Sequence, residues 1–146
     1  MRRPRSRLCL RLTARARWDC VSRTVILLVE DNADSNAALE LFLRTHGFEV
    51  VVAFDGQQGL DQLRSGPRPS LILLDVMMPG KDAHGFRAEQ LADPALASIP
   101  VIVLSGAYDV GEIADRLGAR DYLTKPLDVQ RLLDTIRRYC SPALRA

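Results

Sequence analysis

The apolar run Val25-Ile26-Leu27-Leu28-Val29 is followed directly by two acidic residues, Glu30 and Asp31. Five consecutive aliphatic residues indicate a central strand that is buried on both faces, as in a parallel sheet covered by helices. The arrangement recurs at Leu71–Leu74, where Asp75 follows the apolar run. Acidic residues therefore stand at the carboxyl ends of two predicted central strands.

From Thr24 onward, apolar runs alternate with helix-like segments, as in the repeated βα units of a parallel sheet. The predicted fold is an α/β three-layer sandwich, with a five-stranded sheet between two layers of helices. Asp128 is expected to cap the start of the last helix. The predicted strands are Val25–Val29, Glu49–Ala53, Leu71–Leu74, Val101–Leu104 and Asp121–Leu123. The predicted helices are Asp34–His46, Gly56–Ser65, Gly85–Ala92, Val110–Leu117 and Val129–Cys140.

Right-handed crossovers bring the segments after the carboxyl ends of parallel strands to one edge of the sheet, where ligands bind. The residues predicted at that edge are Glu30, Asp31, Asp75, Ser105 and Lys125. Three neighbouring carboxylates repel one another unless a cation neutralises them, and all-oxygen ligands favour Mg²⁺. The sequence therefore predicts an acidic, magnesium-dependent pocket.

Asp75 is the candidate nucleophile of this pocket, because carboxylates can form aspartyl phosphates and no histidine or cysteine is placed to compete. Lys125 and Ser105 would stabilise the charge on a phosphoryl group during its transfer. Each residue alone also has a simpler explanation. Glu30 and Asp31 could cap a helix, Ser105 could begin a turn, and Lys125 could be a solvated charge. Their coincidence at four strand ends favours a phosphoryl-transfer site.

Four segments together resemble the receiver domains of bacterial two-component response regulators, and the resemblance covers nearly all of residues 24–140. It implies a flavodoxin-like (βα)5 fold with the strand order 2-1-3-4-5. It also implies a signalling phosphoacceptor, and not an enzyme that acts on other substrates. The matching segments are Val25-Ile26-Leu27-Leu28-Val29-Glu30-Asp31-Asn32, Leu73-Leu74-Asp75-Val76-Met77-Met78-Pro79-Gly80, Val103-Leu104-Ser105-Gly106-Ala107 and Asp121-Tyr122-Leu123-Thr124-Lys125-Pro126.

The resemblance implies a role for each matched position in the pocket. Asp75 would accept a phosphoryl group from a histidine of a sensor histidine kinase or a phosphotransfer protein. Asp31 would bind Mg²⁺ directly and Glu30 through water, while Asp75 and the backbone carbonyl of Met77 would complete the protein ligands. Lys125 would pair with Asp75 or with the phosphoryl group, and its peptide bond to proline would be cis.

The resemblance also implies how phosphorylation would be read. Ser105 would move to bind the phosphoryl group and draw the aromatic side chain of Tyr122 inward. This movement would reshape the surface made by Val110–Leu117, the fifth strand and Val129–Cys140. Family members bind downstream target proteins or form homodimers through that surface. Without the motif, Tyr122 would be read as a packing residue beside a strand.

The charge of the chain is unevenly distributed along its length. Residues 1–23 contain eight arginines and one aspartate, a net charge of +7, although the whole chain carries only +2. We expect these residues to be a disordered basic extension, followed by the receiver domain at 24–140 and a short tail at 141–146. An incidental extension is favoured over a nucleic-acid or lipid-binding arm, so nucleic acid is not an expected partner.

No apolar run approaches the roughly 20 residues of a membrane-spanning helix, so membrane insertion is not expected. The three cysteines have neither disulfide nor zinc-site spacing, which fits a reducing cytoplasm. We expect action through a separate target protein, because only six residues follow the last predicted helix. The sequence departs from the family in two places. Glu30 replaces the commoner aspartate, and the loop Gly80–Gly85, which contains Asp82 and His84, is about two residues longer.

Two other classes of function fit parts of this sequence. A haloacid dehalogenase-like phosphohydrolase would use Asp75 catalytically, but it typically has a second aspartate two residues later, where this chain has Met77. A nucleic-acid-binding protein would act through the arginines of residues 1–23 and would bind in a salt-sensitive way.

Overall fold

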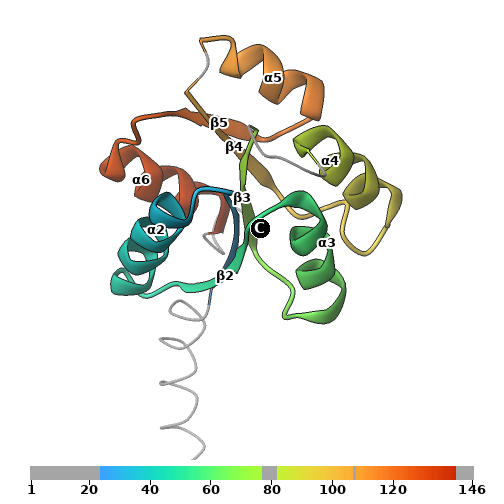
Figure 1. The fold of residues 1–146 in the computed structure, drawn as a ribbon, viewed down its shortest axis with the longest axis horizontal. Coiled ribbons are helices and arrows are strands. Elements are labelled where there is room, and N and C mark those ends of the chain that lie inside the picture. The colour runs from blue at the N-terminus through green and yellow to red at the C-terminus, as the bar shows by residue number, and fades with distance from the viewer. Residues whose placement is uncertain (1–23, 77–81, 107, 141–146) are drawn as a thin grey trace, which may run out of the picture.

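The computed structural model describes residues 24–76, 82–106 and 108–140, and within them the chain forms five strands and five helices (Figure 1). The sheet is parallel, with the strand order β2-β1-β3-β4-β5. The predicted fold class and strand order are therefore confirmed. The strands are β1 (Val25–Val29), β2 (Glu49–Ala53), β3 (Leu71–Asp75), β4 (Val101–Ser105) and β5 (Asp121–Thr124). The helices are α2 (Ala33–Thr45), α3 (Gly56–Ser65), α4 (Ala83–Ala92), α5 (Val110–Leu117) and α6 (Val129–Cys140).

The three central strands account for the long aliphatic runs of the sequence. Every residue of β3 and β4 is buried, as are all but the first residue of β1. The strands extend slightly beyond the predicted bounds, so that Asp75 and Ser105 are the last residues of β3 and β4. Asp75 and Ser105 consequently occupy backbone positions that are paired with the neighbouring strand.

Helices cover both faces of the sheet and form a separate hydrophobic core on each. In Figure 1, α2 and α6 lie on one side, and α3, α4 and α5 lie on the other. Alternate residues of each central strand point to opposite cores, as the pleat of a strand requires. Leu27 and Val29 of β1 pack toward α3 and α4, whereas Ile26 and Leu28 pack toward α2 and α6.

Side-chain caps fix where the helices begin. The Asn32 side chain accepts a hydrogen bond from the Ser35 amide, so Asn32, and neither Glu30 nor Asp31, caps α2. Asp128 accepts from two amides in the first turn of α6, as predicted. None of the helices in the described residues is long and apolar enough to span a membrane.

The start of α4 differs from the prediction. The predicted helix begins at Gly85, after a lengthened loop at Gly80–Gly85, but α4 begins at Ala83, two residues earlier. The Asp82 carboxylate accepts a hydrogen bond from the Gly85 amide at 2.8 Å, and Ala83 is buried in the core. Because Asp82 caps the helix, residues 83–85 of the predicted loop belong to α4, and the His84 side chain is exposed on this helix.

A buried arginine joins α4 to the end of α5. Arg87 donates from Nε to the carbonyl of Leu117 at 2.8 Å and from Nη2 to that of Gly118 at 2.9 Å. Its third nitrogen donates to the side chain of Gln90, which in turn donates to the carbonyl of Leu96. Burial, followed by the nearby charge of Arg120, lowers the pKa of Arg87. Three acceptors thus hold one guanidinium inside the fold.

Candidate functional site

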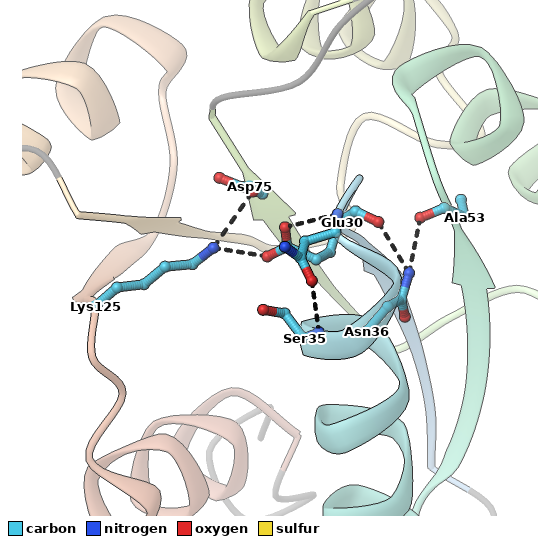
Figure 2. A network of polar contacts seen from close by, with 7 residues as sticks. Glu30, Ser35, Asn36, Ala53, Asp75 and Lys125 are labelled. Carbon is cyan, nitrogen blue, oxygen red and sulfur yellow. Dashed lines mark hydrogen bonds and ion pairs between the residues drawn. The ribbon is translucent and has the colours of Figure 1, made fainter.

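The carboxyl ends of β1, β3 and β5 bring two acids and a lysine into contact. Lys125 follows β5, and its Nζ lies 2.7 Å from Oε2 of Glu30 and 3.3 Å from Oδ2 of Asp75. Figure 2 shows the extended Lys125 side chain reaching across the sheet edge to the two carboxylates. The peptide bond between Lys125 and Pro126 is cis, as the resemblance implied. Glu30, Asp75 and Lys125, which were predicted to meet at this edge of the sheet, are therefore in contact.

Glu30, Asp31 and Asp75 form a group of carboxylates with the geometry of a cation site. One oxygen from each residue can be chosen so that all three lie within 4.8 Å of one another. Glu30 and Asp75 are 1% and 4% exposed, whereas Asp31 is exposed to solvent. Three hard oxygen donors with one side open to solvent fit Mg²⁺, which keeps several of its waters. Met77, the predicted carbonyl ligand, lies outside the described residues.

The crowding of charge at this site alters the protonation of Glu30. Burial, and next a hydrogen bond with Asp75, raise the pKa of Glu30 from 4.5 to about 7. The hydrogen bond from Lys125 acts in the opposite direction but does not outweigh them. One lysine cannot neutralise two ionised carboxylates, and a divalent cation can supply the missing positive charge.

Lys125 remains charged despite its partial burial. Burial alone would lower the pKa of Lys125, but the hydrogen bond to Glu30 and the charge of Asp75 raise it overall. The ammonium group is therefore a fixed positive charge between the two buried carboxylates. It lies where it can stabilise negative charge on either acid or on a group bound to Asp75.

Ser105 and Tyr122 lie on the neighbouring strands β4 and β5. Ser105 is buried at the end of β4, pairs with Thr124 of β5, and accepts a backbone hydrogen bond from the Lys125 amide at 2.9 Å. Tyr122 is 36% exposed, and a Cβ added to Gly111 would lie 3.5 Å from its ring. The Tyr122 ring therefore lies beside the first turn of α5, on the outer part of the fold.

Asn36 is a residue of this region that the sequence analysis missed. Its buried Nδ2 donates to the carbonyl of Glu30 at 2.9 Å and to that of Ala53 at 3.4 Å, which ties the ends of β1 and β2 together (Figure 2). A signal was present, because Asn36 lies on the same helical stripe as Leu39 and Leu43, at spacings i, i+3 and i+7. A polar residue on such a stripe indicates a buried hydrogen bond.

The sequence profile of the response regulator receiver domain matches residues 26–137. The chain belongs to this family. Receiver domains are the phosphoacceptor signalling modules of two-component systems, and they bind Mg²⁺ in an acidic cleft. The match includes four whole strands and all of β1 except Val25, and it contains every described residue of the site.

Two curated relatives illustrate the range of proteins that contain this domain. The chain is 34% identical over 113 residues to protein PilH of Pseudomonas aeruginosa, across 76% of this chain and 93% of the relative. It is 37% identical over 123 residues to the transcriptional regulatory protein CseB of Streptomyces coelicolor, across 80% of this chain. That match covers 51% of CseB, so the chain spans about half the length of this longer relative.

Solved receiver domains share the fold closely. A response regulator receiver protein from Pseudomonas putida superposes with a TM-score of 0.72 and 31% identity, over 80% of this chain and 97% of that one. The receiver domain of a sensor histidine kinase from Pseudomonas aeruginosa PAO1 gives a TM-score of 0.75 and 29% identity, over 81% of this chain and 98% of that one. That crystal structure contains a magnesium ion coordinated in the active-site cleft.

Proposed function

We propose that this receiver accepts a phosphoryl group on Asp75 from the phosphohistidine of a sensor histidine kinase or phosphotransfer protein. The observation that carries the proposal is the contact of Lys125 with both Glu30 and Asp75 at the carboxyl edge of the sheet. Asp75 ends a fully buried strand whose backbone pairs with β4, and its carboxylate contacts Lys125 at 3.3 Å. Such positioning favours in-line attack by a carboxylate oxygen.

The transfer exchanges one bond to phosphorus for another. A carboxylate oxygen of Asp75 attacks the phosphorus atom, the bond between phosphorus and the donor histidine nitrogen breaks, and its electron pair returns to the imidazole. The product is an aspartyl phosphate, which water later hydrolyses. The ammonium of Lys125 pairs with the negative charge on the phosphoryl oxygens, and the hydroxyl of Ser105 donates to one of them.

Glu30, Asp31 and Asp75, with the backbone carbonyl of Met77, are the proposed protein ligands of Mg²⁺. When bound there, Mg²⁺ would supply positive charge to offset that of the carboxylates and of the phosphoryl group. The fit of the site to a hard divalent ion rests on its three oxygen donors and on its deficit of positive charge.

The proposed output is a change in the surface formed by α5, β5 and α6. Movement of Ser105 toward the phosphoryl group vacates space beside β5 and allows Tyr122 to turn inward from its position against Gly111. This surface then binds a downstream target protein or a second copy of the chain. We further propose that residues 24–140 are the signalling unit, that residues 1–23 and 141–146 are extensions, and that the protein acts in the cytoplasm.

Labelling with a small phosphodonor tests the proposal. The full chain is incubated with acetyl phosphate and Mg²⁺, and the mass of the intact protein is measured. We expect a phosphoryl adduct on the wild type and none on Asp75→Asn. The matched control is Asp61→Asn, which removes a carboxylate from the exposed face of α3 and should leave labelling unchanged.

Two results would contradict the proposed function. The first is an adduct of equal yield on Asp75→Asn, which would place the phosphoryl group elsewhere. The second is sustained turnover of p-nitrophenyl phosphate that depends on Asp75, which would indicate a hydrolase. Folding of each variant is checked by circular dichroism, so that loss of labelling cannot be due to unfolding.

A further inference from the structure

A polar cavity lies at the edge of the sheet opposite the acidic site. It has a volume of about 540 Å³, within the range of about 300–1,000 Å³ that is typical of ligand sites. Its lining residues Ser70, Pro100 and Arg120 directly precede β3, β4 and β5, whereas Asp75, Ser105 and Lys125 end or follow these strands. Since parallel strands all run the same way, the two sites lie at opposite ends of the strands.

Three arginines line this cavity, which we name the arginine cavity: Arg68, Arg120 and Arg138. No carboxylate is among the described residues that line it. Arg138 has one acidic neighbour, Asp121, at 3.6 Å, so the three arginines and this aspartate together carry 3 − 1 = +2. The cavity therefore concentrates positive charge in a folded part of the chain that is otherwise acidic.

The arginines are not all occupied in holding the fold together. Arg68 donates to the carbonyl of Ala95 and to the hydroxyl of Ser98 at 3.0 Å, which fixes its guanidinium at the cavity wall. Among the described residues, the Arg120 side chain has no hydrogen bond or ion pair. The Ser98 hydroxyl accepts from Arg68 and keeps its own proton for another acceptor.

The arginine-rich residues 1–23 join the fold at the same edge. Thr24 leads into β1, and the carbonyl of Val25 accepts a hydrogen bond at 2.8 Å from the amide of Ser70, a residue of the cavity lining. The net charge of +7 on residues 1–23 is thus connected to the fold beside the cavity.

We propose that the arginine cavity binds a ligand with two or more neighbouring phosphate groups, as nucleoside polyphosphates and nucleic-acid backbones have. Guanidinium groups form paired hydrogen bonds with phosphate oxygens, and three of them match an anion with more than one phosphate. The hydroxyl of Ser98 supplies a further donor at the wall of the cavity. This inference does not depend on phosphorylation of Asp75, because the two sites lie at opposite edges of the sheet.

Calorimetric titration of the full chain with pyrophosphate and with ATP tests the proposal. EDTA is present, so that no Mg²⁺ can recruit phosphate to the acidic site. We expect wild-type binding that weakens with added salt, and an affinity at least about tenfold lower in Arg120→Gln/Arg138→Gln, which loses two charge-assisted interactions. The matched control Arg131→Gln/Arg137→Gln removes two exposed charges from α6 outside the cavity and should change affinity less than about threefold.

Competition with a single-stranded decanucleotide identifies the source of the phosphate. If the oligonucleotide displaces ATP, and Arg120→Gln/Arg138→Gln binds neither ligand, the cavity is assigned to a nucleic-acid backbone. If ATP stays bound when the oligonucleotide is added, the cavity is assigned to a nucleotide. The proposal is overturned by absence of wild-type binding to either small probe, or by equal affinities in the cavity variant and its control. Thermal melting confirms that both double variants are folded.

Discussion

The ammonium nitrogen of Lys125 lies 2.7 Å from a carboxylate oxygen of Glu30, closer than the 3.3 Å that separates it from Asp75. The lysine therefore makes its shorter contact with the buried glutamate. A cation that enters this pocket meets a site already partly neutralised by Lys125. The strength of cation binding and the position of the lysine are consequently coupled.

Replacement of Lys125 by alanine should strengthen Mg²⁺ binding. The substitution removes a positive charge that repels the cation, and we expect the dissociation constant to fall by roughly tenfold at low salt. Calorimetric titration with MgCl₂ measures the change. Lys125→Arg keeps the charge and serves as the control. A Lys125→Ala protein that binds Mg²⁺ more weakly than the wild type would show that the lysine helps to build the metal site.

The stability of the metal-free protein should fall as the pH rises from about 4.5 through about 7. Burial raises the pKa of Glu30 from 4.5 to about 7, so the folded state holds this proton more tightly than the unfolded chain. The resulting stabilisation, up to about 3 kcal/mol, is complete below the lower value and is lost above the upper one. Urea unfolding in EDTA at pH 5 and pH 8 measures it.

Glu30→Gln is the control for the pH prediction, because an amide cannot titrate. In this variant, the free energy of unfolding should no longer contain the change caused by residue 30, while other titratable groups still make it depend on pH. Addition of Mg²⁺ at pH 8 should restore stability to the wild type, since the ionised carboxylate is the form that binds a cation. Identical pH profiles for the two proteins in EDTA would argue against the raised pKa.

Gly59→Ala should destabilise the fold, although alanine favours helices. A Cβ at this position in α3 would lie 2.8 Å from the ring of Phe86 and 3.2 Å from Val29, both of which are fully buried. Overpacking of this kind costs about 1–3 kcal/mol, more than the gain of about 1 kcal/mol in helix propensity. Gly111→Ala is the matched control, because its Cβ meets Tyr122 at an ordinary 3.5 Å. Urea unfolding should separate the two variants.

Arg87→Met should loosen the carboxyl end of α5. The variant loses the donors to the carbonyls of Leu117 and Gly118, and we expect a loss of roughly 2–4 kcal/mol in the free energy of unfolding. Hydrogen exchange should increase in α5 more than in α2. Arg116→Met, on the exposed side of α5, should change stability by less than about 0.5 kcal/mol. Equal exchange in both variants would indicate that Arg87 does not hold this end of the helix.

Much of the fold was predictable because the central strands have a strong chemical signature. Strands made of consecutive aliphatic residues are stable mainly when helices cover both faces of the sheet. The connections of a parallel sheet then bring the carboxyl ends of its strands to one edge. The meeting of Glu30, Asp75 and Lys125 follows from that rule alone. The resemblance to receiver domains rested on four matched segments, and the roles of the individual site residues remain predictions.

Other features could not be predicted, since they depend on side-chain packing between distant segments. Nothing in the spacing of the sequence indicates that Arg87 reaches carbonyls thirty residues later, or that Lys125 lies closer to Glu30 than to Asp75. The start of α4 was misplaced because Asp82 caps the helix within a segment that looked like an added loop. Local patterns identify the elements, whereas tertiary contacts decide their ends and partners.

The contact between Glu30 and Lys125 joins residues that are 95 positions apart in the chain. During synthesis, the first acid leaves the ribosome long before the lysine exists, and β5 can dock only when the last fifth of the domain has emerged. A truncated or nascent chain therefore lacks the charge that completes the phosphoacceptor site. The contact of Glu30 with Lys125 therefore forms only after nearly the whole domain has been synthesised.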